Sequence, residues 1–179
     1  MRGIMFTQRI GYSAAVIAVV LAAWVTPFSA VAESKLTDLN GEWRGSGIDR
    51  DSPFEKFQET NCHTKIEADE SHMNSVMICE GQQVLKKVIR LTVTLDGDKF
   101  TGDVDQSTLA RGDKTPDVDK GTVSGQKVKD TANLRIRFPG LMPNATVALV
   151  LLNPSSYTMH VSSLGSTIMN VTFSKVDKP

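Results

Sequence analysis

Hydrophobic and polar residues alternate along most of the chain after residue 40. From Leu85 to Leu95 the odd positions are hydrophobic with one exception, Lys87, and the even positions include lysine, arginine and threonine. A period of two is typical of a strand with one buried face, so Leu85 and the other odd residues are expected to point inward. The same alternation predicts strands over 134–138, 157–162 and 169–174.

Turn-forming residues separate these segments at intervals of roughly ten residues, a spacing typical of antiparallel sandwiches and barrels. Asp96-Gly97-Asp98 predicts a tight hairpin turn, because glycine readily takes a positive φ. Asn153-Pro154 and Leu164-Gly165 predict two further turns. After residue 32 no segment has a helical period, beyond a short helical turn over 36–39.

The segment 145–152 is apolar on both faces. Such a strand is either covered on both sides or forms an edge that invites aggregation, and closing the sheet removes its edges. The pattern therefore predicts an all-β fold, a single antiparallel barrel of about 8 to 10 strands, with a β-sandwich as the alternative.

Trp43 lies among glycines at 41, 45 and 47, which a period of two places on the same inward face. Glycines in a strand mark bends or close approaches of the backbone. We expect Trp43 to close one end of the barrel and the glycines to make room around it.

The first 32 residues read as a signal peptide, with Arg2 and Arg9 before an apolar run over 14–25 and a small-residue cleavage site ending at Ala32. Cleavage leaves 33–179 as a single β-barrel domain in the periplasm or secreted, with no membrane span. A retained anchor is the alternative. Removing two arginines leaves a slightly acidic chain without a basic cluster, which disfavours nucleic acid as a partner.

Cys62 and Cys79 are the two cysteines of the chain. An even count in an exported protein favours a disulfide between them, and two buried free thiols are the alternative. No C-x-x-C pair suggests thiol chemistry.

Gly41-Glu42-Trp43 resembles the G-x-W start of lipocalins and of the wider calycin group of small barrels. The resemblance implies that the tryptophan closes the base of the barrel and that a basic residue packs over it, a role for which Lys175 is placed. The chain is also similar to periplasmic inhibitors of secreted metalloproteases, and in its layout to uncharacterised exported proteobacterial proteins. The inhibitor resemblance implies that residues 33–40 form a free tail that enters a protease.

Catalytic and metal-binding signals are weak. His63, His72 and His160 lack a metal-ligand spacing and are expected on the surface. The acidic stretch over 96–119 does not match a calcium loop and is expected to be a solvated loop. No G-x-S-x-G motif is present, and a paired-carboxylate glycosidase stays open. We expect a non-catalytic protein without metal or cofactor.

The first functional hypothesis is an exported binding protein for a small apolar ligand. Its proposed ligand-binding residues are Trp43, Met77, Leu91, Phe138, Tyr157, Met159 and Phe173, and Val93, Ile136, Leu149, Leu151 and Val171 extend the same inward surface. In so small a barrel these side chains are expected to fill the core. A protein-binding or inhibitor role through the N-terminal tail or a 105–118 loop, with a secreted or periplasmic protein as partner, is the second hypothesis, and a structural envelope protein the third.

Overall fold

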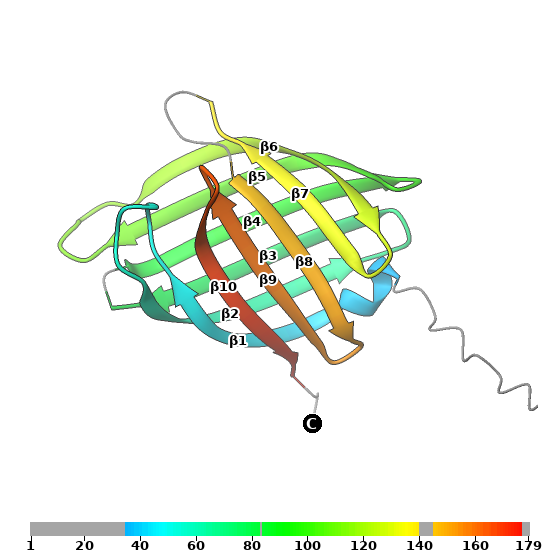
Figure 1. The fold of residues 1–179 in the computed structure, drawn as a ribbon, viewed down its shortest axis with the longest axis horizontal. Helices are drawn as coiled ribbons and strands as arrows, with labels where there is room; N and C mark the ends of the chain where they lie inside the picture. The colour runs from blue at the N-terminus through cyan, green and yellow to red at the C-terminus, as the bar shows by residue number, and fades with distance from the viewer. Residues whose placement is uncertain (1–34, 83, 140–144, 177–179) are drawn as a thin grey trace, which may run out of the picture. The chain divides into compact units, whose positions relative to one another are not determined.

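The computed structural model describes residues 35–82, 84–139 and 145–176, apart from the side chains of 151 and 152. The predicted signal peptide lies outside these residues. The described elements are η1 (Leu36–Leu39), β1 (Gly41–Asp49), β2 (Gln58–Ala68), β3 (His72–Gly81), β4 (Val84–Asp96), β5 (Lys99–Ala110), β6 (Asp117–Val128), β7 (Thr131–Arg137), β8 (Ala145–Asn153), β9 (Ser156–Ser163) and β10 (Ser166–Lys175) (Figure 1).

The ten strands form one closed antiparallel barrel in which each strand pairs with its neighbours in sequence, and β1 also pairs with β10. The predicted barrel is confirmed, and the sandwich alternative is wrong. Closure explains why β8 can be apolar on both faces: it lies between β7 and β9 and is not an edge.

The predicted alternation holds through most strands, but β4 departs from it at its start. A register irregularity between Val84 and Lys86 inserts one extra residue against β5. Val84 is consequently buried, whereas Leu85 is 42% exposed, so its predicted inward position is wrong. A bulge of this kind reverses the phase of the strand locally. Lys87, the exception in the hydrophobic pattern, is buried on the inward face.

The predicted turns are confirmed, while the predicted solvated loop over 96–119, and with it the loop over 105–118, is wrong: β5 and β6 occupy most of this stretch. Gly97 and Gly165 join hairpins with φ of 58° and 74°. In contrast, β5 continues to Ala110 and β6 begins at Asp117, which leaves only a short connection between them. Polar residues such as Gln106 and Asp119 pair across this hairpin. Backbone pairing extends the strands where the hydrophobic alternation has already ended.

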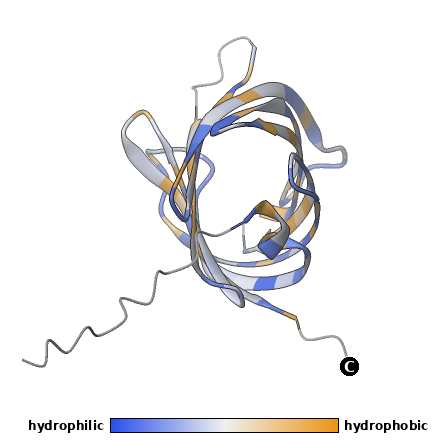
Figure 2. Cartoon of the chain, turned by 90° about the vertical axis from the view of Figure 1, so that its right-hand side faces the viewer, coloured by the Kyte–Doolittle hydropathy of each residue, from blue (hydrophilic) through white to orange (hydrophobic). Residues whose placement is uncertain are grey.

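One end of the barrel is closed by η1 and Trp43, and Figure 2 views the molecule from this end. Leu36 and Leu39 of η1 are buried against the core, which confirms the predicted helical turn, here a 3-10 turn. The indole Nε1 of Trp43 donates a hydrogen bond to the carbonyl oxygen of Leu39 at 2.8 Å. Lys175 Nζ lies 5.1 Å from the centroid of the Trp43 ring and donates to the carbonyl oxygen of Asp38 at 3.1 Å.

The glycines beside Trp43 allow β10 to approach β1 closely. A Cβ atom at Gly45 would lie 2.6 Å from the Phe173 ring, and one at Gly47 would overlap the backbone oxygen of Asn170. Both positions are therefore closed to larger residues. The absence of side chains here lets Phe173 occupy the interior, where its ring stacks on Tyr157.

Candidate ligand-binding cavity

The interior of the barrel holds a partly open cavity of about 380 Å³. Its wall is mostly apolar and includes Ile66, Met73, Ile89, Leu134 and Val147. The expectation of a filled core is wrong. Inward positions held by small residues, among them Ser75 and Ala145 in the cavity wall, supply too little volume to fill a closed barrel of ten strands.

Five of the seven predicted ligand-binding residues line this cavity: Met77, Leu91, Phe138, Tyr157 and Met159. Ile136 and Leu149 also line it, whereas the side chain of Leu151 lies outside the described part of the chain.

The other predicted inward residues are buried and do not line the cavity. Trp43, Phe173 and Val171 are fully buried, and Val93 is 1% exposed. The Tyr157 ring meets Trp43 edge-on at 4.9 Å between centroids and stacks on Phe173 at 4.6 Å. Tyr157 thus presents the cavity-facing surface of an aromatic cluster, and Trp43 supports it from the closed end.

Two hydroxyl groups belong to the cavity wall near this aromatic cluster. Thr64 is 2% exposed and pairs in register with Trp43 on β1 and Met77 on β3. Thr64 Oγ1 has almost no accessible surface, and the Thr64 side chain lies within hydrogen-bonding reach of Tyr157. Burial raises the pKa of Tyr157, and a side-chain hydrogen bond with Thr64 is the smaller, opposing effect. The Tyr157 phenol therefore stays protonated at neutral pH.

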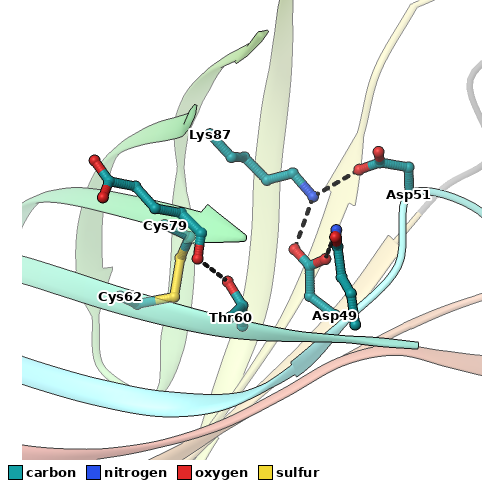
Figure 3. The surroundings of a disulfide bond; sticks show 8 residues. Asp49, Asp51, Thr60, Cys62, Cys79 and Lys87 are labelled. Carbon is teal, nitrogen blue, oxygen red and sulfur yellow. Dashed lines mark hydrogen bonds and ion pairs between the residues drawn. A yellow bond between two sulfur atoms is a disulfide. The ribbon is translucent and has the colours of Figure 1, made fainter. Parts of the chain in front are cut away.

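A charged cluster lies at the other end of the cavity, shown in Figure 3. Lys87 Nζ contacts Asp49 Oδ2 at 3.1 Å and Asp51 Oδ1 at 2.9 Å, and Gln58 Nε2 donates to Asp49 Oδ1 at 3.1 Å. Burial lowers the pKa of Lys87, but the two carboxylates outweigh this effect, and the pKa is raised overall. Lys87 is consequently a permanent cation whose charge is compensated within the protein.

Sequence reasoning missed this cluster although a signal for it existed. Lys87 interrupts an inward hydrophobic row, and Asp49 continues the inward row of Trp43, Gly45 and Gly47 by period two. A buried lysine is rarely found without a paired carboxylate. Two inward charges of opposite sign at the same barrel end would have indicated an internal ion pair.

The segment between β1 and β2 covers part of this end of the cavity. Asp51, Ser52 and Pro53 line the cavity, and Asp51 is held by Lys87. Arg50 donates to the carbonyl oxygen of Thr167 from Nε at 2.8 Å and lies 4.3 Å from the centroid of the Phe57 ring. The segment is therefore fastened both to β10 and to β4.

The predicted disulfide is confirmed: Cys62 on β2 is bonded to Cys79 on β3, its direct partner in the register. The alternative of free thiols is wrong. In register, Cys62 lies beside Gly45 and Cys79 beside Lys87, so the bond is part of the inner wall between β1 and β4 (Figure 3).

The histidines do not converge on a site. His63 lies near Glu42, at 3.6 Å, and His72 near Asp69, at 3.4 Å, both exposed. His160 is partly buried and lies 3.5 Å from the Thr167 hydroxyl. Within residues 35–82, 84–139 and 145–176, no three His, Cys, Asp or Glu side chains gather as a metal site would require.

In those same ranges, no helix has the length and apolar composition of a transmembrane segment. Comparison of the chain with models of known protein families, and with curated proteins, finds no match to either.

Proposed function

We propose that this protein is an exported, non-catalytic binding protein that holds a small apolar ligand inside its barrel. The cavity is the observation that carries the proposal. An engineered apolar cavity of about 150 Å³ accommodates benzene, so by proportion about 380 Å³ suits a ligand of roughly 15 non-hydrogen atoms. Ligand pockets of proteins generally range from about 300 to 1,000 Å³.

A lipocalin-like identity is part of this proposal. The closed barrel, the Trp43 plug and the Lys175 ammonium group over the indole support it, because the resemblance implied each of them. Export through the N-terminal signal is supported by the Cys62–Cys79 disulfide, since such bonds persist in oxidising compartments.

The inhibitor hypothesis has less support. Residues 36–39 are folded as η1, and Leu36 and Leu39 are buried against the barrel. This half of the supposed tail is part of the fold, so entering a protease would require it to leave the core.

A filled cavity tests the proposal. Ser75→Phe places a ring in the cavity wall, whereas the control Val76→Phe introduces the same ring on the opposite, more exposed face of β3. We expect the fluorescent neutral probe N-phenylnaphthylamine to bind the wild type and the control, and to bind Ser75→Phe at least about tenfold more weakly, because its space is taken. Equal binding by all three proteins would contradict a ligand site in the barrel.

A further inference from the structure

We propose that the ligand is a single-chain amphiphile, which lies in the barrel with its hydrocarbon end toward Tyr157 and an uncharged polar head group beside Lys87 and Gln106. This inference rests on the proposed function and deepens it, because it names the class of ligand and its orientation. Three observations carry it: the distribution of polar groups along the cavity, their accessibility, and the balance of their charges.

Polar side chains are distributed unevenly along the cavity. The charged and amide side chains of its described wall all belong to the end opposite η1, and they are Arg50, Asp51, Lys87 and Gln106. Lys87 and Gln106 are neighbours there, because Gln106 pairs in register with Ile89, the next inward residue of β4. The wall toward η1 is mainly apolar and includes Leu39, Ile66, Met77, Leu91 and Met159. A ligand that spans the cavity therefore meets hydrocarbon at one end and polar groups at the other.

The polar end is also the accessible end. Because η1 and Trp43 close the opposite end of the barrel, the cavity opens beside the charged cluster. Asp51 is 38% exposed there, and Gln106 is partly exposed. Tyr157, in contrast, is 4% exposed, and its hydroxyl shares a hydrogen bond with Thr64. A head group at the mouth meets reachable donors and acceptors, whereas these two hydroxyls at the closed end already bind each other.

Lys87 and Gln106 can form hydrogen bonds beyond those within the protein. An ammonium group carries three N–H donors, and Lys87 uses two of them on Asp49 and Asp51 (Figure 3). The Gln106 amide contacts the Thr108 hydroxyl through Nε2 at 3.4 Å, which among the described residues leaves its carbonyl oxygen as an acceptor. A wholly apolar ligand would remove water from these groups without replacing its hydrogen bonds. A hydroxyl head group replaces them, because it both donates and accepts.

The charges at the mouth compensate each other, which favours an uncharged head group. Lys87 Nζ lies 3.1 Å from Asp49 Oδ2 and 2.9 Å from Asp51 Oδ1, and Arg50 donates to the carbonyl oxygen of Thr167. The two cations and two carboxylates of this cluster sum to zero. A ligand anion would compete with Asp51 for Lys87, and a ligand cation would compete with Lys87 for Asp51. A neutral head group requires neither exchange.

Trp43 reports the orientation of a bound ligand. It is the only tryptophan after residue 32, and its ring meets that of Tyr157 at the closed end, with 4.9 Å between centroids. Bromine quenches indole fluorescence only at short range, so two isomers of bromodecanol are compared, one brominated at the end of the chain and one beside the hydroxyl-bearing carbon. Equal occupancy is set by a separate titration in which each isomer displaces N-phenylnaphthylamine. We expect the isomer brominated at the end of the chain to quench Trp43 more strongly.

A pair of variants tests the head-group contact. Gln106→Leu removes the amide from the cavity wall with little change of size, and the matched control Gln126→Leu makes the same exchange at an exposed position of β6 outside the wall. We expect Gln106→Leu to bind decanol about fivefold to tenfold more weakly, the usual worth of one hydrogen bond, and to bind decane no more weakly than the wild type. The control is expected to bind both probes as the wild type does.

Three results would overturn the inference while leaving the proposed function intact. The first is equal quenching by the two isomers, or stronger quenching by the isomer brominated near its hydroxyl group. The second is an equal effect of Gln106→Leu on decanol and decane. The third is tighter binding of decanoate than of decanol, which would mean an anionic head group. If the wild type takes up none of these probes, and not N-phenylnaphthylamine either, the proposed function itself is wrong.

Discussion

Lys87 is the one polar residue in the hydrophobic row of β4, and it is buried on the inward face of that strand. Its side chain is only 9% exposed, and Asp49, at 3%, is its most deeply buried partner. Two charges removed from water are tolerated when they compensate each other, and removal of one partner is costly. The pattern marked Lys87 only as a lapse, and its partners lie 38 and 36 residues away in sequence, which periodicity does not reveal.

Lys87→Met is expected to destabilise the fold by about 3–5 kcal/mol, because the buried Asp49 carboxylate loses its counterion. Urea unfolding of the wild type and the variant measures this difference. The control is Lys65→Met, which breaks the exposed Lys65–Glu67 pair and should have no measurable effect, since exposed pairs contribute little. Similar losses of stability in both variants would show that the buried Lys87 ion pair contributes no more to the free energy of unfolding than the exposed Lys65 pair does.

Because of Tyr157, the free energy of unfolding is expected to decrease at alkaline pH. Burial raises its pKa above the ordinary value of 10.0, so the folded state keeps the phenol protonated where the unfolded chain ionises it. This contribution is complete below about pH 10 and is lost progressively as the pH rises toward the folded pKa. Lys87, whose pKa is also raised, acts in the same direction.

We therefore expect the urea midpoint of the wild type to fall as the pH rises above about 10, and the fall to be smaller in Tyr157→Phe. Lys87 is present in both proteins, so the difference between them isolates the phenol. An identical fall would mean that the Tyr157 phenol titrates in the folded state as it does in the unfolded chain.

At the scale of elements, the strands with one hydrophobic face could be predicted from sequence, and their ends could not. The end of β5 and the start of β6 show no regular alternation of hydrophobic and polar residues, so only backbone pairing defines them. The bulge after Val84 is set by the pairing with β5, which the sequence of β4 alone does not contain. The hairpin at Gly97 was predictable because its cause, a positive φ, is local.

The β2–β3 hairpin carries the disulfide, and its removal is the test at this scale. Cys62→Ala combined with Cys79→Ala opens a cross-link between residues 17 apart in sequence. The chain-entropy model gives a loss of about 3 kcal/mol for a loop of this size. Urea unfolding of the double variant and the oxidised wild type measures the loss. Equal stability of the two would show that the cross-link restricts the unfolded chain too little to matter.

At the scale of the whole molecule, barrel closure followed from the need to protect apolar strands, but the cavity did not follow from the sequence. A cavity is the difference between the space that ten closed strands enclose and the volume of the inward side chains. Small residues at Ser75 and Ala145 indicate where space is left, once the register has placed them in one wall. The inward residues were predicted well, and the free volume between them required the barrel geometry.

Native mass spectrometry tests the central claim, ligand binding in the cavity, most directly. The protein is purified gently from a host that exports it and is measured beside a denatured aliquot, with Ser75→Phe treated in the same way. We predict an excess mass on the wild type that is lost on denaturation and is absent from Ser75→Phe. A bare wild-type mass that stays bare after incubation with decanol and decane would contradict the claim.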